Sequence, residues 1–165
     1  MLIGRGIAAT ALAVAIICGG TQAALAASCW QANEVSAAKV RDLQTRLMVA
    51  GLKCRMQGPE MLAAYNRFVV AHRAVIQQHN GTLRARFIRL EGRSGGERDY
   101  DRYTTALANA YGSTAADRSA CAELAGLARR AAAVKAADLV SLAEDYGLQP
   151  EMRGGSCPMR MAASR

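Results

Sequence analysis

Several residue patterns that would point to a particular chemistry are missing from this chain of 165 residues. No two cysteines have the C-x-x-C spacing of a thioredoxin-type redox site, and no C-x-x-C-H motif occurs for covalent attachment of a c-type haem. No zinc-type spacing and no Ser-His-Asp set stands out, and no glycine-rich phosphate loop follows a strand. The sequence therefore predicts no catalytic residues and no metal site.

A hydrophobic run long enough to span a membrane is also missing. The apolar stretch 6–18 is shorter than the ~20 residues that a stable span needs. Arg5 precedes this stretch, and small residues with an A-L-A motif follow it. A positive start, a short apolar segment and an A-x-A exit are typical of a secretory signal peptide. We expect residues 1–27 to be such a signal, cut after Ala26 or Ala27, and no transmembrane span in the mature chain.

The same segment leaves one alternative for the location, a lipid anchor at Cys29. Signal peptidases for lipoproteins prefer leucine three residues before the modified cysteine, but Ala26 holds that place and Leu25 lies one residue too early. The single Arg5 excludes a twin-arginine signal. We therefore expect a periplasmic or secreted protein, with a lipoprotein as the minor alternative.

The apolar pattern after the signal predicts helices. The first apolar stripe recurs at three- and four-residue steps and consists of Val40, Leu43, Leu47, Ala50 and Cys54. It predicts a helix of roughly 20 residues, capped by Asn33 with Glu34 in its first turn. A second helix opens at Pro59, and its apolar stripe runs from Leu62 to Leu90. We expect one long helix to about Leu90, with a kink at 80–81 as an option because glycine in a helix costs only ~1 kcal/mol.

Three shorter helices should follow. The glycines at 92–96 predict a loop, and a third helix spans about 97–111. Thr114 and Asp117 have the T-x-x-D spacing of a capping box for a fourth helix. A short fifth helix spans 136–146.

No segment shows convincing two-residue alternation, so the expected fold class is all-α. Helices joined by short loops pack as an antiparallel bundle, here of four to five helices stapled by disulfides. Gly147 suits the left-handed conformation that ends a helix. We expect one helical domain at 28–150, followed by an irregular C-terminal tail at 151–165. The mature chain, about 138 residues, is long enough for one domain with its own core.

Four of the five cysteines remain after the signal is removed, and an even number in an oxidising compartment predicts two structural disulfides. Cys54 ends the first helix, and two further reversals of the bundle bring Cys121 back to the same end. Elimination then pairs Cys29 with Cys157, which would pin the tail to the mature N-terminus. Four cysteines allow three pairings, so this pairing is a hypothesis.

The net charge of +8 indicates a basic protein. Its densest basic stretch is a candidate partner surface made of Arg84, Arg86, Arg89, Arg93, Arg98 and Arg102. Acids such as Glu97 and Asp99 interleave with these arginines, which favours a solvated face over a dedicated polyanion site. We expect an envelope protein or an anionic polymer as the partner and no specific nucleic acid. The oligomeric state is left open.

His72 and His79 are weak candidates for binding a cofactor such as haem. They lie two helical turns apart, about 10 Å of rise, so they face the same way but cannot share one metal. We favour hydrogen-bonded histidines at the edge of the core and assign no cofactor. The tyrosines predict an interior rich in phenol rings, with a ligand cleft as the alternative to plain core packing: Tyr65, Tyr100, Tyr103, Tyr111 and Tyr146.

The segments CWQANEVSAAKVRDLQTRLMVAGLKCR, YNRFVVAHR and YDRYTTALANAYG together resemble a family of small exported proteins from sphingomonads and related alphaproteobacteria. The resemblance covers most of the mature chain and implies export, helices and disulfides. Some members carry the label S-adenosyl-L-homocysteine hydrolase. That enzyme needs NAD on a strand-glycine-helix fold, and no G-x-G-x-x-G after a strand occurs here, so no functional residue is carried over.

These observations favour a non-catalytic periplasmic helical protein that binds an envelope partner. One alternative is a small enzyme or a haem or ligand carrier that uses the bundle interior. A second alternative is a secreted effector or inhibitor.

Overall fold

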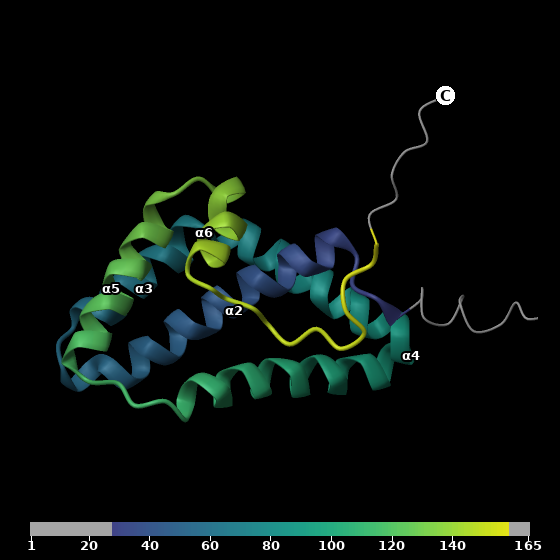
Figure 1. The fold of residues 1–165 in the computed structure, drawn as a ribbon, viewed down its shortest axis with the longest axis horizontal. Helices are drawn as coiled ribbons and strands as arrows, with labels where there is room; N and C mark the ends of the chain where they lie inside the picture. The colour runs from purple at the N-terminus through teal and green to yellow at the C-terminus, as the bar shows by residue number, and fades with distance from the viewer. Residues whose placement is uncertain (1–27, 159–165) are drawn as a thin grey trace, which may run out of the picture.

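The computed structural model describes residues 28–158, so the predicted signal peptide and the last part of the predicted tail lie outside the described residues. The elements follow in the order α2 (Ala32–Lys53), the short 3-10 helix η1 (Cys54–Met56), α3 (Glu60–Ala71), α4 (Arg73–Gly112), α5 (Arg118–Ala133), the 3-10 helix η2 (Ala136–Asp138) and α6 (Leu139–Asp145) (Figure 1). Within 28–158 the only strand-like pairing is an isolated bridge between Trp30 and Ser156. The predicted all-α class is confirmed.

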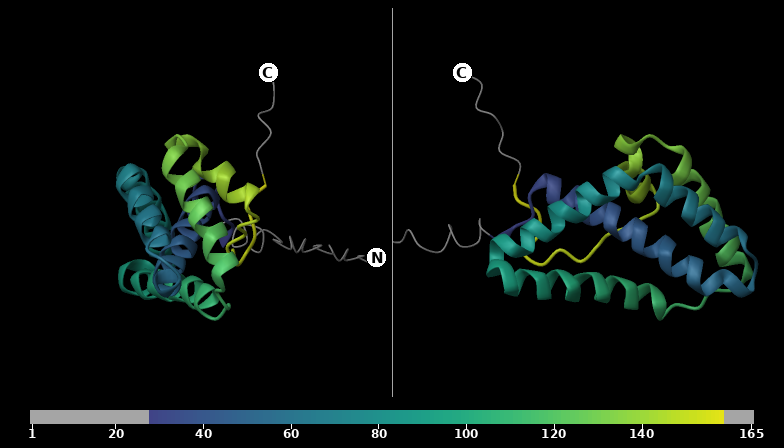
Figure 2. Two further views of the ribbon diagram at one scale, coloured as in Figure 1. Left: turned by 90° about the vertical axis from the view of Figure 1, so that its left-hand side faces the viewer. Right: turned by 180° about the vertical axis from the view of Figure 1, so that it is seen from behind.

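Helix α2 is the central element of an antiparallel arrangement. It packs against α3, α4, α5 and α6, while α3 and α5 pack closely on each other (Figures 1 and 2). None of the helices in the described range is both long and apolar enough to cross a bilayer. The expected bundle is therefore present, arranged around one shared helix.

Helix α4 is a hairpin of two arms, 73–91 and 93–112, that reverses direction at Gly92 (Figure 1, right-hand end). Gly92 has φ 69° and ψ 174°, a backbone conformation that glycine adopts without steric cost. Gly96 lies so close to the first arm that a Cβ atom there would be 2.4 Å from the backbone of Ile88. The loop expected at 92–96 is correct in position but too long, because only Gly92 leaves the helical conformation.

The single long helix expected from 59 to 90 is wrong, since the chain bends at His72. His72 has φ −117° and ψ 20°, and it separates α3 from α4. Its buried ring donates from Nε2 to the carbonyl oxygen of Ala131 at 2.8 Å, which ties the bend to α5. The change of direction lets α3 pack on α5 and α4 pack on α2. The option of a kink at 80–81 is not realised, because Gly92 is the one residue inside α4 with non-helical backbone angles.

Two predicted helix caps are also wrong. Gln31 rather than Asn33 caps α2, and its backbone N–H donates to the carboxylate of Glu34 at 2.9 Å. Asp117 alone caps α5 by accepting a backbone N–H from the first turn at 2.8 Å, whereas the Thr114 hydroxyl donates back to the end of α4. In both places the acid of the predicted motif takes part in the cap. The expected partners, Asn33 in α2 and Thr114 before α5, do not.

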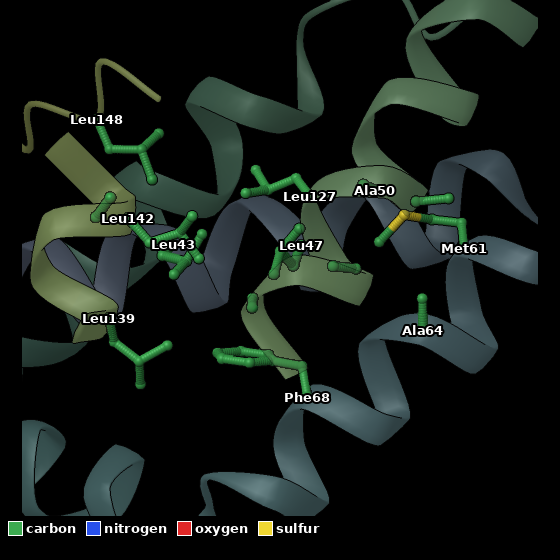
Figure 3. Close-up of a cluster of buried hydrophobic side chains, with 14 of the residues drawn as sticks. Leu43, Leu47, Ala50, Met61, Ala64, Phe68, Leu127, Leu139, Leu142 and Leu148 are labelled. Carbon is green, nitrogen blue, oxygen red and sulfur yellow. The ribbon is translucent and has the colours of Figure 1, made fainter. Parts of the chain in front are cut away.

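The interior divides into two clusters along α2. The aliphatic core surrounds the C-terminal half of α2, and its side chains come from α2, α3, α5, α6 and the segment after α6 (Figure 3). Its largest fully buried members are Phe68, Leu43, Leu47, Leu127 and Leu139. The aromatic cluster lies at the N-terminal end of α2 and consists of Trp30, Ala37, Ala38 and Leu83, with Val35, Phe87, Tyr100, Tyr103 and Met152 packed against them.

Both predicted disulfides are present. Cys54–Cys121 joins the C-terminal end of α2 to the start of α5, with the two Cα atoms 5.6 Å apart. Cys29–Cys157 joins the segment before α2 to the tail, with a Cα separation of 5.0 Å. One bridge therefore lies at each end of α2, and the pairing inferred from the bundle topology is confirmed.

The segment after α6 returns along the molecule to the start of α2 (Figure 1). Gly147 ends α6 with the predicted positive φ, 64°. Residues 151–158 form no helix. Instead, the N–H of Trp30 donates to the carbonyl of Gly155, and the N–H of Cys157 donates to the carbonyl of Trp30, both at 2.8 Å. The described part of the tail is thus irregular, as expected, and hydrogen-bonded in place.

Candidate ligand-binding groove

A groove of about 560 Å³ opens between α2, the end of α4, α5 and the segment 146–149. This volume lies within the range typical of small-molecule sites, about 300–1,000 Å³. We call it the α2–α5 groove. Its apolar lining includes Val49, Ala50, Ala120, Leu124, Leu127 and Leu148, and its polar lining includes Asp42, Arg46, Lys53, Tyr111, Glu123 and Tyr146.

Small side chains leave the space for this groove. Alanines at 115, 116 and 120 line its side at the loop before α5 and at the first turn of that helix. Leu124 and Leu127 follow at helical spacing and supply bulkier apolar groups further along the same wall. The Cys54–Cys121 disulfide fixes the distance between α2 and α5 at this end of the molecule.

Asp42 and Tyr111 form the polar floor of the groove. Asp42 is only 2% exposed, and its Oδ1 accepts a hydrogen bond from the Tyr111 hydroxyl at 2.6 Å. Burial raises the pKa of Asp42, although the Tyr111 hydroxyl and the Arg46 charge oppose this shift. Burial also raises the pKa of Tyr111, as does its hydrogen bond to Asp42. The phenol therefore stays a donor, and the pair links α2 to the second arm of α4.

Arg46 lies one helical turn after Asp42 on the same side of α2. Its guanidinium carbon is 5.9 Å from the centre of the Tyr111 ring, within the range of a cation–π contact. The side chain is partly buried and its charge acts on Asp42, but no hydrogen bond or ion pair joins it to another of the described residues. A partly buried guanidinium keeps five N–H donors that need acceptors.

The other charged groups of the groove are committed or exposed. The Lys53 ammonium donates to the carbonyls of Tyr111 at 3.2 Å and Gly112 at 3.1 Å, and also to that of Thr114. It therefore serves as a cap for the last carbonyls of α4. Glu123 is exposed on α5, where water can solvate its carboxylate.

A second cavity of about 310 Å³ is also lined by the Asp42–Tyr111 pair. Asp42, Tyr111, Thr114 and Gln149 line both spaces. Tyr103 also lines the second cavity, and its buried hydroxyl has no hydrogen-bond partner among the described residues. Burial and the nearby Asp42 charge raise the pKa of Tyr103, so this hydroxyl keeps its proton.

The two histidines do not meet at this groove. His72 is buried beside Phe68, with a ring separation of 5.6 Å, and its Nε2 is bound to the Ala131 carbonyl. His79 is partly buried in the first arm of α4, and this burial lowers its pKa. Within the described residues no group of three or more His, Cys, Asp or Glu side chains is placed to hold a metal ion.

The six arginines of the predicted partner surface lie in different environments. Arg84 is paired with Glu97 at 2.7 Å, and Arg102 with Asp99 at 2.8 Å. The Arg84 hydrogen bond lowers the pKa of Glu97. Arg89 contacts Glu34 through an exposed side chain, and Arg93 and Arg98 are exposed. Arg86 is buried and does not contribute to the surface.

Arg86 instead organises the N-terminal end of α2. Its guanidinium donates to the Glu34 carboxylate at 2.7 Å and to the carbonyls of Cys29 at 2.9 Å and Ser28 at 2.7 Å. The same group lies 3.9 Å from the centre of the Trp30 ring. Burial alone would raise the pKa of Glu34, but the Gln31 N–H and the two guanidinium groups outweigh it and lower that pKa.

Sequence reasoning missed Asp42, Arg46 and the Glu34–Arg86 pair. One signal was available, because residues 34, 38, 42 and 46 follow each other at four-residue steps along one side of the apolar stripe of α2. Three of these four positions are charged. Charges that border a stripe so regularly indicate that this side faces a partly buried polar region rather than open solvent.

The comparisons with known proteins leave the groove to be interpreted from its own residues. No family model, no curated protein and no solved structure matches the chain.

Proposed function

We propose that this chain is an exported, non-catalytic helical protein of the cell envelope that binds a ligand in the α2–α5 groove. Two disulfides support a location in an oxidising compartment, where such bonds form and persist. The signal-peptide pattern and the resemblance to small exported proteins support the same location, periplasmic or secreted.

The observation that carries the binding function is the combination of an apolar wall with Arg46 inside one groove. Apolar walls with a few placed polar groups are typical of ligand sites. The groove lies between elements that a disulfide and the Asp42–Tyr111 hydrogen bond hold in place. A site of this kind is formed before its ligand arrives, which lowers the entropic cost of binding.

The arginine surface of α4 is a weaker candidate than the α2–α5 groove for the site that binds the envelope partner. Arg84 and Arg102 already have acidic partners, and Arg86 is buried with Glu34. Such pairing neutralises much of the positive charge that an anionic polymer would need. The groove therefore becomes the preferred site for the envelope partner, and the exposed Arg93 and Arg98 remain the part of the hairpin available to a polyanion.

The Cys29–Cys157 disulfide bears on the alternative of a lipid anchor. A lipoprotein attaches its lipid through the sulfur of the modified cysteine, and the Cys29 sulfur is bonded to Cys157. Intact mass of the native protein from fractionated cells tests the proposed location. We expect a mature chain that starts near Ala27 or Ser28 and is four hydrogen atoms lighter than its reduced form. A lipid-modified product that starts at Cys29 would contradict it.

Photocrosslinking in intact cells tests the proposed binding. A photoreactive amino acid would replace Ala115, an exposed residue of the groove, in the full-length chain. The matched control carries it at Ala63, an exposed alanine of α3 that does not line the groove. We expect an adduct from position 115 only, and its mass distinguishes a protein from a small molecule. Equal adducts at both positions, or none at position 115, would contradict the proposal.

A further inference from the structure

We infer that the α2–α5 groove binds a single-chain amphipathic anion, with its anionic head group on Arg46 and its hydrocarbon chain along α5. This inference rests on the proposed function and adds the class of ligand. It depends on three features of the groove. These are the Arg46 guanidinium, the apolar wall, and the placement of the guanidinium and the wall on different helices.

The first feature is the Arg46 guanidinium, which has no ion pair or hydrogen bond within the described residues. The Arg46 charge acts on Asp42, but the Asp42 Oδ1 already accepts the Tyr111 hydroxyl, and no ion pair joins the two side chains. The Arg46 guanidinium carbon lies 5.9 Å from the centre of the Tyr111 ring, and its N–H groups remain available to an acceptor in the groove. A carboxylate is a fitting acceptor, because it accepts two parallel N–H bonds from one guanidinium.

The remaining charges of the groove do not favour a cation. Lys53 is positive and is held by backbone carbonyls. Glu123 is exposed, so its carboxylate is already stabilised by solvent. Burial raises the pKa of Asp42, which weakens it as a fixed negative charge. A ligand cation would therefore meet a positive pair of side chains on α2 and a buried acid that already has a donor.

The second feature is the apolar wall. Leu124 of α5 is partly buried and, with the alanines at 115, 116 and 120, gives the groove its accessible apolar surface, whereas Val49, Leu127 and Leu148 line it but are themselves buried. Leu127 and Leu148 also belong to the aliphatic core (Figure 3), so the wall is continuous with a rigid interior. Hydrocarbon placed there leaves water and contacts side chains that do not need to rearrange.

The third feature is the order of these groups along the helices. Arg46 and Tyr111 lie on the α2 and α4 side of the groove, where Val49 and Ala50 are buried, and Ala120 and Leu124 lie on the α5 side, where the Glu123 carboxylate is exposed to solvent. A ligand with one anionic end and one apolar end matches this division. A ligand that is charged at both ends, or apolar throughout, would leave one of the two sides unmatched.

The experiment compares two surfactants with the same chain and opposite head groups. Calorimetric titration of the purified, disulfide-intact protein uses dodecanoate and dodecyltrimethylammonium, both below their micelle concentrations. We expect dodecanoate to bind at least tenfold more tightly than the cation. The Arg46→Gln variant should weaken dodecanoate binding by about tenfold and should not weaken binding of the cation, because one of the two positive charges that repel it is removed.

Two further variants separate charge at the site from charge in general. Arg67→Gln removes an exposed arginine of α3 outside the groove and should bind dodecanoate like the parent chain. Ala120→Phe fills the groove and should abolish dodecanoate binding while Arg46 remains. The inference is overturned if the cation binds as tightly as dodecanoate, or if Arg46→Gln and Arg67→Gln bind alike.

The outcome also distinguishes this inference from the proposed function. An adduct at position 115 in cells, without dodecanoate binding in the purified protein, overturns the ligand class and leaves the binding function standing. If neither the adduct at position 115 nor dodecanoate binding is observed, the ligand class and the proposed binding function are both overturned.

Discussion

The two ends of α2 are stabilised in different ways. Its C-terminal half is surrounded by aliphatic side chains, whose burial needs no particular orientation and hardly depends on pH. Its N-terminal end is held by Trp30, Arg86 and Glu34, whose contacts depend on angle and charge. Asp42 and Arg46 lie between the two, where the groove opens. The chain thus combines a deeply buried aliphatic half with a polar end that specifies where the tail docks.

The two phenylalanines of the chain provide the sharpest contrast between the ends. Phe68 is fully buried in the aliphatic core, so Phe68→Ala should lower the free energy of unfolding by about 3–5 kcal/mol. Phe87 is only partly buried in the aromatic cluster, and Phe87→Ala should cost clearly less. Urea unfolding followed by circular dichroism measures both. Equal losses of unfolding free energy would show that the two clusters contribute equally to stability.

The disulfides should differ in the kind of change that their removal causes. Replacing both Cys54 and Cys121 by alanine should lower the global stability by roughly 2–4 kcal/mol. Replacing Cys29 and Cys157 should additionally release the tail, because the bridge and the Trp30 backbone bonds hold it together. Limited proteolysis should then cleave the segment 148–158 first. Protection of this segment in the second variant would show that the hydrogen bonds alone are sufficient.

The buried arginine should matter far more than its exposed neighbour two residues away. Arg86→Met removes hydrogen bonds to Glu34 and to two backbone carbonyls, and should cost about 2–3 kcal/mol because Arg89 still faces Glu34. Arg84→Met removes an exposed pair with Glu97 and should change stability little. Thermal unfolding of both variants tests this. Similar melting temperatures would indicate that the N-terminal end does not depend on Arg86.

The two buried acids of α2 should respond to pH with opposite signs. The pKa of Glu34 is lowered in the folded protein, so its contribution to stability is present above pH 4.5 and is lost as the pH falls through the folded value. The pKa of Asp42 is raised, so stability decreases as the pH rises from 3.8 through the folded value. Unfolding measured as a function of pH should lose the first dependence in Glu34→Gln and the second in Asp42→Asn.

More of the aliphatic end than of the polar end could be predicted from the sequence, although the Cys29–Cys157 bridge at the polar end was also expected. Stripes such as Leu43, Leu47 and Cys54 report burial through their spacing alone, and the bundle topology then places Cys121 beside Cys54. The Glu34–Arg86 pair joins residues 52 positions apart, which no local pattern reveals. The bend at His72 was missed for the same reason, since it depends on a contact with Ala131 on another helix.

The groove was missed because its charged residues resemble ordinary surface residues. Asp42 and Arg46 differ from the other acids and arginines only in what the second arm of α4 and α5 place around them. Sequence reasoning pointed instead to the density of arginines between 84 and 102, where four of the six arginines are paired with acids. Counting charges along the chain cannot distinguish a neutralised pair from an unmatched guanidinium.

The most direct test of the account is a map of ligand contacts by amide NMR of the labelled, disulfide-intact protein with dodecanoate. The groove account predicts shift changes at the amides of Arg46, Ala120, Leu124 and Gly147, and none near Gly92 in the α4 hairpin. Changes centred on Arg93 and Arg98, with the groove unaffected, would contradict it and return the arginine surface as the site of binding.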